Sequence, residues 1–313
     1  MNAKVSIVIA SYNTGKYIVE CVNSASQQDY ENIEVIVVND GSTDNTEELL
    51  SELARNNAKL KILTQKNQGQ SIARNNGTAV ATGEFIIFLD SDDLFDYSLV
   101  SKCVSALTST NSDIVFFNGE TFFDDAYDEK TTSFAPKYIR NSSLCGEAMC
   151  SHTFFKRSWK LKNYTVSPCM FMSKTQLVRD NPFYPGIVHE DNLFTTKILL
   201  SKKSTVICIN DILYKRRIRN DSIMTSKKSE RNAVGYLTVA RKMTSLRSEH
   251  DKELNSCLNS FISFCISSSI SDAKSYFNNI PKKLREEYFS AIKEIGFFKI
   301  RKKTLVKLLL SIF

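Results

Sequence analysis

Apolar and polar positions follow two alternating periodicities over the first 120 residues. Apolar runs of strand length are separated by stretches whose apolar residues recur at helical spacing, and the runs occupy residues 5–10, 33–39, 60–64, 84–90 and 113–118. Strands that alternate with helices form βαβ crossovers, which build a mostly parallel sheet with helices on both faces. The pattern therefore predicts an α/β fold.

The pattern changes in the second part of the chain. From about residue 120 to 164 it dissolves into polar and aromatic residues, which we interpret as a variable insertion. It returns with an apolar run at 168–174, a helix that opens near Glu190 and a pair of strands at 204–210 and 212–217. Later residues have a helical pattern only. We expect an α/β domain (1–225) followed by a C-terminal helical region (226–313).

Composition narrows the class of protein without identifying a function. The chain has 313 residues, 42% of them hydrophobic and 24% charged, which is an ordinary globular composition. Its eight cysteines are scattered with no C-x-x-C pair, so we expect reduced core cysteines in a cytoplasmic protein. The N-terminal run does not fit a signal peptide, and no apolar run reaches the roughly 18–20 residues of a spanning helix. We expect a protein that is not integral to a membrane.

Polar residues gather where three of the predicted strands end. The sequences are SYN at 11–13, DGSTDNT at 40–46 and DSDD at 90–93. In open α/β sheets, ligands bind outside the carboxyl ends of the strands. We therefore expect these three loops to converge on one crevice.

Three carboxylates directly follow the fourth predicted strand. Asp90 and Asp92 project to the same side of an extended chain and repel each other unless a cation lies between them. Mg²⁺ or Mn²⁺ suits such oxygen ligands and completes its shell with phosphate oxygens and water. The alternative is that the cluster caps the next helix, for which one carboxylate would be enough. The pattern favours a metal site, with Asp93 as a helix cap or a supporting group.

Two further charged residues belong to the expected crevice. Asp40 either forms part of a common turn or accepts the imide N–H of a pyrimidine ring. Arg74 either pairs with pyrophosphate or ribose oxygens or is a solvated helix charge. The sequence contains no glycine-rich phosphate cradle, so the phosphates of a bound nucleotide would have to be neutralised by the metal and by arginines.

Later in the chain, one acidic pair and one basic cluster could also take part in chemistry. Glu190 and Asp191 open a predicted helix, where they either complement the helix dipole or supply a general base. Lys215, Arg217 and Arg219 share one face of a predicted strand. They either protect an edge strand or hold a leaving phosphate.

Taken in order, these motifs resemble the family 2 inverting glycosyltransferases with the GT-A fold, a Rossmann-like sheet. The resemblance runs through "VSIVIASYN", "VVNDGSTDNT", "NQGQSIARNNG", "FLDSDD", "HEDNLF" and "YKRRIRNDSI" and covers about residues 3–225. It implies a nucleotide-diphospho-sugar donor. The first nucleotide-binding loop and the donor-side residues would be Ser11, Tyr12, Asn13, Asp40 and Arg74.

The resemblance also assigns roles to the remaining acids and arginines. Asp92 would be the direct ligand of Mn²⁺ or Mg²⁺, and Asp90 would contact the donor ribose, the metal or a metal-bound water. Asp191 would be the catalytic base, with Glu190 as a weaker candidate. The donor phosphates would face Arg217 and Arg219. The sequence departs from the family pattern in lacking proline before Tyr12, and the insertion at 120–164 has no motif that indicates the acceptor.

The implied reaction is transfer of a sugar with inversion. The donor would be a UDP-hexose or a UDP-N-acetylhexosamine, and the acceptor a glycan or a polyprenyl-diphosphate-linked glycan, in capsule, O-antigen or exopolysaccharide synthesis. Two alternatives stay open. The run "IIFLDSDD" also fits a haloacid-dehalogenase-type phosphatase, and a non-catalytic nucleotide-sugar-binding protein would share every motif except the base.

The net charge of +7 gathers late in the chain. Residues 297–313 contain five Lys or Arg and no acid, with apolar residues near helical spacing at Phe298, Leu305, Leu309 and Ile312. These charges exclude a spanning helix, but they favour an amphipathic helix on the anionic inner face of the plasma membrane. The alternative is a helix packed on its own domain. Nucleic acid is not an expected partner, because no recognition motif accompanies the charge.

Overall fold

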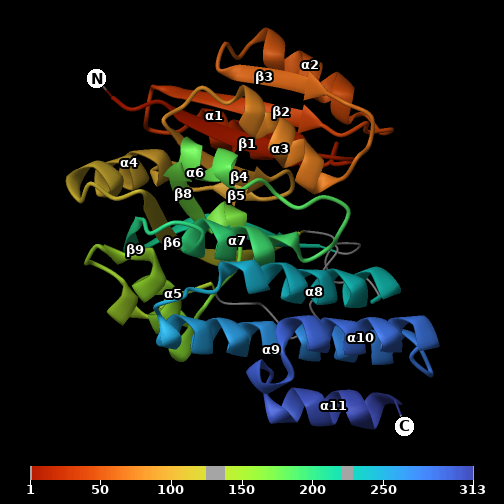
Figure 1. The fold of residues 1–313 in the computed structure, drawn as a ribbon. Helices are drawn as coiled ribbons and strands as arrows, with labels where there is room; N and C mark the ends of the chain where they lie inside the picture. Colours follow the sequence, from red (N-terminus) through yellow and green to blue (C-terminus); the bar gives the residue numbers. More distant parts are fainter. Residues whose placement is uncertain (1, 125–137, 220–227, 313) are drawn as a thin grey trace.

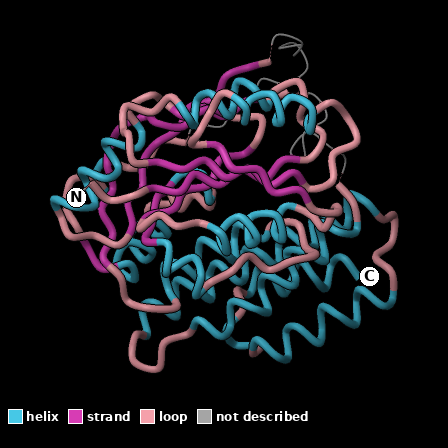
Figure 2. The backbone as a smooth tube through the Cα atoms, turned by 90° about the horizontal axis from the view of Figure 1, so that it is seen from above, coloured by secondary structure: helices cyan, strands magenta, loops and turns pink. Residues whose placement is uncertain are grey.

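A computed structural model describes residues 2–124, 138–219 and 228–312. The N-terminal strands and their flanking helices lie at the top of Figure 1, helix α7 (Glu190–Leu200) lies below them, and the C-terminal helices lie below α7. The view in Figure 2, turned by 90°, shows strands gathered in one half of the molecule and a set of long helices in the other.

The N-terminal part of the sheet is parallel, as predicted. Its strands are arranged in the order β3-β2-β1-β4, and their bounds are β1 (Val5–Ser11), β2 (Ile33–Asn39), β3 (Leu60–Thr64) and β4 (Phe85–Asp90). Every residue of β2 is buried, which is why that strand has an almost uninterrupted apolar sequence. The crossovers contain α1 (Ile18–Ser26), α2 (Thr46–Arg55) and α3 (Gln70–Val80).

The rest of the sheet is mixed. The order continues β4-β8-β6-β9-β5, with bounds β8 (Phe171–Lys174), β6 (Ile114–Phe123), β9 (Thr205–Ile218) and β5 (Leu94–Phe95). Strand β8 is antiparallel to both β4 and β6, whereas β6 and β9 are parallel. The short β7 (Met149–Cys150) pairs with β9. A central α/β sheet flanked by helices confirms the predicted fold class.

The expected pair of strands at 204–210 and 212–217 is wrong. A single strand, β9, spans both segments. The polar residues Asn210 and Asp211 look like a turn in the sequence. In the structure they lie where the pairing of β9 with β6 shifts register, between Phe116 and Gly119 of β6. Because β6 continues beside β9 past that point, the irregularity is absorbed within one ladder.

The segment read as an insertion contains regular structure that the apolar pattern did not reveal. Helix α5 (Ser151–Lys160) buries Phe154 and Phe155 and presents polar residues elsewhere. Ten residues give too few repeats of a helical pattern to stand out among polar neighbours. The same segment contains the 3₁₀ turn Ser142–Leu144. Before it lies α4 (Leu99–Ser109), and after it lie the 3₁₀ turn Pro168–Met170 and α6 (Thr175–Asp180).

The chain ends in helices, as predicted. They are α8 (Glu230–Lys242), α9 (Lys252–Tyr276), α10 (Lys282–Ile295) and α11 (Lys302–Ile312), with 3₁₀ turns at Met243–Leu246 and Phe297–Lys299. Helix α8 packs on α9 and α7, and α5 packs on α9. One continuous cluster of buried apolar residues extends from Val5 to Leu308. The division near residue 225 stays a prediction, and no helix in the described part of the chain has the length and apolar character needed to cross a bilayer.

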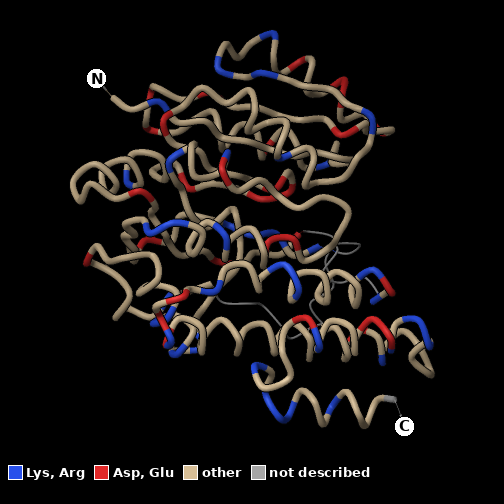
Figure 3. The backbone as a smooth tube through the Cα atoms, in the orientation of Figure 1, with Lys and Arg blue, Asp and Glu red and all other residues tan. Residues whose placement is uncertain are grey.

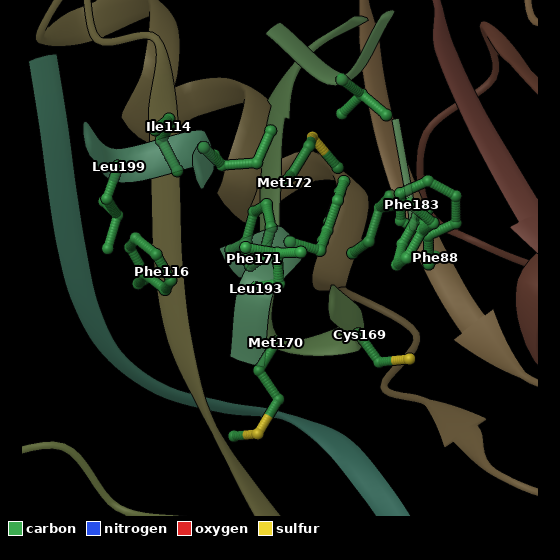
Figure 4. Close-up of a cluster of buried hydrophobic side chains, with 14 of the residues drawn as sticks. Phe88, Ile114, Phe116, Cys169, Met170, Phe171, Met172, Phe183, Leu193 and Leu199 are labelled. Atoms are coloured by element: carbon green, nitrogen blue, oxygen red, sulfur yellow. The ribbon is translucent and has the colours of Figure 1, made fainter. Parts of the chain in front are cut away.

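Helix α7 lies at the centre of the molecule. Nine of its eleven residues are buried, because the sheet covers one side and the C-terminal helices cover the other. Phe183 and Phe194 stack with ring centroids 3.7 Å apart, and Phe88 meets Phe183 edge-on at 5.1 Å. Figure 4 shows Phe88 beside Phe183, with Leu193 and Leu199 of α7 in the same cluster. This packing anchors the first turn of α7, which carries Glu190 and Asp191.

Candidate active site

The polar loops after β1, β2 and β4 meet at one edge of the sheet. Ser11 aligns with Asn39, the residue before Asp40, and Ala10 aligns with Asp90. The crossovers run in one direction from β1 to β3 and in the other direction to β4, so strand order reverses between β1 and β4. Such a switch point is where open α/β sheets bind ligands.

The loop after β1 is held by its own side chains. Ser11 is buried, with its Oγ 2.8 Å from Thr14 Oγ1. Asn13 has φ 51°, and its Oδ1 accepts a hydrogen bond of 2.7 Å from the Thr43 backbone N–H. The Tyr12 side chain is 47% exposed. Of the three predicted donor-loop residues, Tyr12 and Asn13 are therefore exposed and Ser11 is buried.

Asp40 joins the second loop to the start of α3. Its carboxylate is 3% exposed and accepts hydrogen bonds from Gln65 Nε2 at 2.7 Å and from the backbone N–H groups of Gln68 and Gly69 at 2.9 and 2.8 Å. Gly41 has φ +72°, and a Cβ there would lie 2.8 Å from the backbone nitrogen of Asn67. Asp40 thus has a structural role in the turn, and its predicted contact with a base stays a prediction.

Arg74 links two acids that lie far apart in the sequence. Its side chain is 4% exposed, with Nη2 2.6 Å from Asp90 Oδ1 and Nη1 3.3 Å from Glu190 Oε1. The guanidinium lies 5.1 Å from the centre of the Phe183 ring. Burial would raise the pKa of Asp90, but Arg74 and Arg216 hold that pKa below its usual range. Arg74 is thus a buried bridge between carboxylates, not the free cation expected for a diphosphate.

Strand β9 holds the loop that follows β4. Arg219 Nε donates to Asp92 Oδ2 at 2.7 Å, and Arg217 Nε donates to the Asp92 carbonyl oxygen at 2.9 Å. Asp93 is buried and accepts from the Arg217 backbone N–H at 2.7 Å and from the Tyr214 hydroxyl. Burial, with Asp92 and Asp90 nearby, raises the pKa of Asp93.

The helix-cap role considered for Asp93 is wrong. In the first turn of α4 the Val100 backbone N–H donates to Gln28 Oε1 at 3.0 Å, and the N-cap residue Ser98 donates from its backbone N–H and hydroxyl to Asp96 Oδ1 at 3.0 and 2.7 Å. Asp93 fastens the acidic loop to β9, so it belongs to the support of the site.

The two acids at the start of α7 differ in their partners. Glu190 pairs with Arg74, whereas Asp191 Oδ1 accepts two hydrogen bonds of 2.9 Å from Asn192, one from its backbone N–H and one from Nδ2. Burial raises the pKa of both carboxyls. Asp191 is therefore hydrogen-bonded by a neutral residue, and burial raises its pKa although Arg74 and Arg216 act in the opposite direction. A carboxyl with a raised pKa suits a general base.

One residue near these acids was not singled out from the sequence. Arg216 is largely buried, its Nη1 donates to the Tyr138 hydroxyl at 2.6 Å, and its charge lowers the pKa of Asp90 and Asp191 against the raising effect of burial. Strand alternation puts Arg216 on the face opposite Arg217, which was the signal available in the sequence. Arg217 itself packs among Glu20, Tyr17 and Phe122 with 8% of its side chain exposed.

The acids after β4 suit a hard divalent cation by their chemistry. Among the described residues, no group of three or more His, Cys, Asp or Glu is arranged to hold a metal ion. Mg²⁺ and Mn²⁺ in nucleotide sites need only one or two carboxylates, because phosphates and water supply the other ligands. Asp90 and Asp92, whose side chains are 29% and 20% exposed, match that requirement.

The fold and site together define an α/β protein with a cluster of acids and arginines at the carboxyl ends of its parallel strands. A family model described as "Glycosyl transferase family 2" matches residues 6–181. The glycosyltransferase GlyG of Streptococcus pneumoniae serotype 4 is 32% identical over 232 residues, which cover 72% of this chain and 75% of GlyG. This chain belongs to glycosyl transferase family 2, which sets aside the phosphatase alternative.

Other proteins extend the similarity. A chondroitin synthase of Escherichia coli is 27% identical over 79% of this chain, which spans only 37% of that protein. Two solved structures share the fold. TarS 1–349 of S. aureus with UDP-GlcNAc has a TM-score of 0.72 at 23% identity, covering 97% of this chain and 83% of that one. The mannosyltransferase PcManGT of Pyrobaculum calidifontis with GDP-Man and Mn²⁺ has a TM-score of 0.59 at 15% identity, covering 99% and 87%.

Proposed function

We propose that this glycosyltransferase moves a sugar from a nucleotide-diphospho-sugar to an acceptor hydroxyl with inversion at the anomeric carbon. The observation that carries the proposal is the Arg74 bridge, which brings Asp90 and Glu190 together across 100 residues. Asp191 directly follows Glu190, and its hydrogen bonds come from Asn192 instead of Arg74. One crevice then contains a base, a pair of metal-binding acids and a set of cations.

The chemistry assigns one task to Asp191. The acceptor hydroxyl oxygen bonds to the anomeric carbon as its proton passes to the Asp191 carboxylate. The bond from the anomeric carbon to the diphosphate oxygen breaks, and its electron pair leaves with the nucleoside diphosphate. A glycosidase would need a second carboxyl to protonate its leaving oxygen, whereas a diphosphate leaves as a stable anion. Asp191, whose hydrogen bonds come from the neutral Asn192, suits this reaction.

The donor would lie over the carboxyl ends of β1, β2 and β4. Tyr12 offers an exposed ring on which the nucleobase can stack, and Asp40 offers a carboxylate to the nucleobase. Ser11 and Asn13 hold the loop in shape through their hydrogen bonds. The leaving diphosphate carries negative charge, which Arg219 and Arg216 can offset. UDP-hexose or UDP-N-acetylhexosamine is the favoured donor, and TarS, which has the same fold, has been solved with UDP-GlcNAc.

A divalent cation, Mn²⁺ or Mg²⁺, would be held by Asp92 with Asp90 beside it. When bound, it would act as a Lewis acid on the departing diphosphate. Arg219 bonds to Oδ2 of Asp92, so this arginine orients the proposed ligand. The other structural neighbour has been solved with Mn²⁺.

The acceptor would be a glycan or a polyprenyl-diphosphate-linked glycan in the synthesis of a surface polysaccharide. The chondroitin synthase among the relatives supports a glycan acceptor. The decisive experiment is a panel of UDP- and GDP-sugars, each assayed for nucleotide release with Mn²⁺ or EDTA and with lipid-linked acceptors. Release from one UDP-sugar that depends on Mn²⁺ and on an acceptor would support the proposal. If no donor turns over in any combination, transfer is contradicted and a non-catalytic binding role is favoured.

We also propose that the tail, residues 297–313, attaches the protein to the inner face of the plasma membrane. Helix α11 packs on α9 through Thr304 and Leu308, whereas Phe298 and Leu310 are 99% and 72% exposed. The Ile312 side chain lies outside the described residues. Figure 3 shows that the charged residues of α11 are basic. Apolar side chains beside Lys and Arg suit an anionic leaflet.

A vesicle assay tests the tail. The variant F298S/L310S should lose binding to vesicles containing phosphatidylglycerol and keep the thermal stability of the wild type, because both side chains are exposed. F289S is a matched control, since Phe289 is 50% exposed on α10 outside the tail. Equal vesicle binding by the wild type and the double variant would contradict attachment.

A further inference from the structure

Helix α7 begins at a residue with an unusual backbone. His189, its N-cap, has φ 67° and ψ 21°, the left-handed conformation that residues other than glycine rarely adopt. Such a conformation costs free energy and persists only where the surroundings impose it. The next two residues are Glu190 and Asp191. Whatever imposes this turn therefore also sets the direction in which the proposed base points.

The contacts that hold His189 come from the C-terminal helices. The Tyr236 ring of α8 stacks on the His189 ring with centroids 3.8 Å apart and planes 16° apart. Asn232 Nδ2, also on α8, lies 3.4 Å from His189 Nε2. Asp272 Oδ2 of α9 lies 3.9 Å from the same nitrogen. The imidazole is thus enclosed by residues that follow it by more than 40 positions.

Helix α8 also touches the backbone just before His189. A Cβ on Gly235 would lie 2.4 Å from the Val188 carbonyl oxygen and 3.1 Å from Val188 Cγ2. Glycine in the middle of a helix lowers helix stability, so its presence here matches a direct approach of the two backbones. Gly235 and Tyr236 are adjacent, and together they contact both the backbone and the ring of the same turn.

Asn192 connects this turn to the carboxylate of Asp191. Its Nδ2 lies 3.3 Å from the His189 carbonyl oxygen and 2.9 Å from Asp191 Oδ1. Its backbone N–H donates to the same two oxygens at 3.2 and 2.9 Å. A rotation of the His189 backbone would therefore move the Asn192 amide and, with it, Asp191.

We propose that α8 is a positioning element for the catalytic base: Gly235 and Tyr236 clamp Val188 and His189, and Asn192 transmits that geometry to Asp191. The inference rests on the proposed role of Asp191. It gives the C-terminal helices a part in the reaction, whereas the sequence motifs of the family end before them. Tyr236 is a positioning residue, because it contacts His189, which precedes the proposed base, and none of the reacting groups.

Three variants of α8 test the clamp. Y236A removes the stacked ring, Y236F keeps it, and L237A removes a buried side chain of similar size from the next position of the same helix, where Leu237 is 4% exposed. For each variant, kcat, the Kd of UDP and amide hydrogen exchange over residues 186–196 are measured. Y236A should lower kcat by about 10- to 100-fold, because a misplaced catalytic group costs about that much. The Kd of UDP should stay within about twofold, and exchange over 186–196 should accelerate.

Comparing Y236A with Y236F, L237A and the D191N background tests the clamp even if one variant is unstable. Y236F should restore both kcat and slow exchange, and L237A should change neither at a temperature where the variant is folded. In a D191N background, Y236A should add less than about a threefold loss, because both changes act through one group. Equal losses in Y236A and L237A, or unchanged exchange in Y236A, would overturn the clamp. Full transfer by D191N alone would instead overturn the base assignment, and exchange would still test the clamp.

Discussion

The two sides of the candidate site are held together in different ways. On the side of β1 and β2, the contacts join loops that are close in the sequence. Asn13 accepts from Thr43, 30 positions later, and Asp40 accepts from Gln65, 25 positions later. These loops belong to consecutive βαβ units, so the local fold brings them together.

On the side of the acids, the partners are much farther apart. Arg74 and Glu190 are separated by 116 positions, and Asp92 and Arg219 by 127. Arg74 of α3 pairs with the last residue of β4 and the first residue of α7, and Asp92 after β4 pairs with Arg219 after β9. These segments meet only in the complete fold. The nucleotide side is therefore a product of local topology, whereas the acid side depends on the whole chain. Substitutions on the two sides should differ in what they disturb.

The largest expected effect is on catalysis and comes from Asp191→Asn. Removing a general base should lower the transfer rate by about 10²- to 10⁴-fold. The Kd of UDP should stay unchanged, because the proposed nucleotide site lies on the side of β1 and β2. In the wild type, burial raises the pKa of Asp191, so kcat/KM should rise with pH along an acid limb whose midpoint lies above the ordinary value of about 3.9. Steady-state kinetics and calorimetry measure both. A variant that transfers sugar at the wild-type rate would contradict the assignment.

A second prediction concerns the bridge between the acids. Arg74→Met would leave the buried Glu190 and the partly exposed Asp90 without their buried cation, which should lower the free energy of unfolding by about 3 kcal/mol. Lys102→Met is the matched control. Lys102 pairs with Asp211 at 2.6 Å, but both side chains are exposed, so the cost should be at most about 1 kcal/mol. Urea unfolding compares the two variants. Similar losses would mean that Arg74 does not hold the acids together.

The third prediction sharpens the contrast through pH. Glu34 of β2 is buried, and although burial raises its pKa, hydrogen bonds from Lys61, Ser6 and Thr82 hold that pKa well below its usual range. A carboxyl with a lowered pKa stabilises the fold above its unfolded pKa of about 4.3, and that stability is lost as the pH falls below this value. Glu34→Gln should therefore cost about 2 kcal/mol at pH 7 and much less at pH 3.

Unfolding free energies at the two pH values test this expectation. Glu47→Gln serves as a control, because Glu47 is exposed on α2 and its substitution should change stability by less than about 0.5 kcal/mol at either pH. If Glu34→Gln costs as much at pH 3 as at pH 7, then Glu34 stabilises the fold through packing and not through its charge.

Much of the parallel half could be predicted from the sequence. The apolar runs of β1, β2 and β4 are buried on both faces, so they stand out without any knowledge of their neighbours. The acids at the strand ends follow from the same topology. By contrast, α5 was missed because it is short and polar on its outer side, and β9 was divided because Asn210 and Asp211 look like a turn until β6 lies beside them.

The roles of individual charges were harder to predict than their presence. The sequence indicated Arg74 as a cation in the expected crevice, but only the folded chain shows that its guanidinium forms ion pairs with two carboxylates. Arg217 and Arg219 were grouped by strand alternation, yet Arg217 is packed under aromatic rings and Arg216 influences the acids. The sequence shows that a residue is charged, but which residue it pairs with depends on the folded structure.

The sequence by itself determined the α/β class, the order of the motifs and the residues at the strand ends, because each depends on periodicity and on contacts between consecutive elements. The tertiary structure decided that Glu190 pairs with an arginine, whereas Asp191 accepts hydrogen bonds from the neutral Asn192. It also decided that helix α8 holds the turn at His189, through a ring stack and a backbone contact at Gly235. These outcomes depend on packing between segments tens to more than a hundred residues apart, which leaves no local signature in the chain.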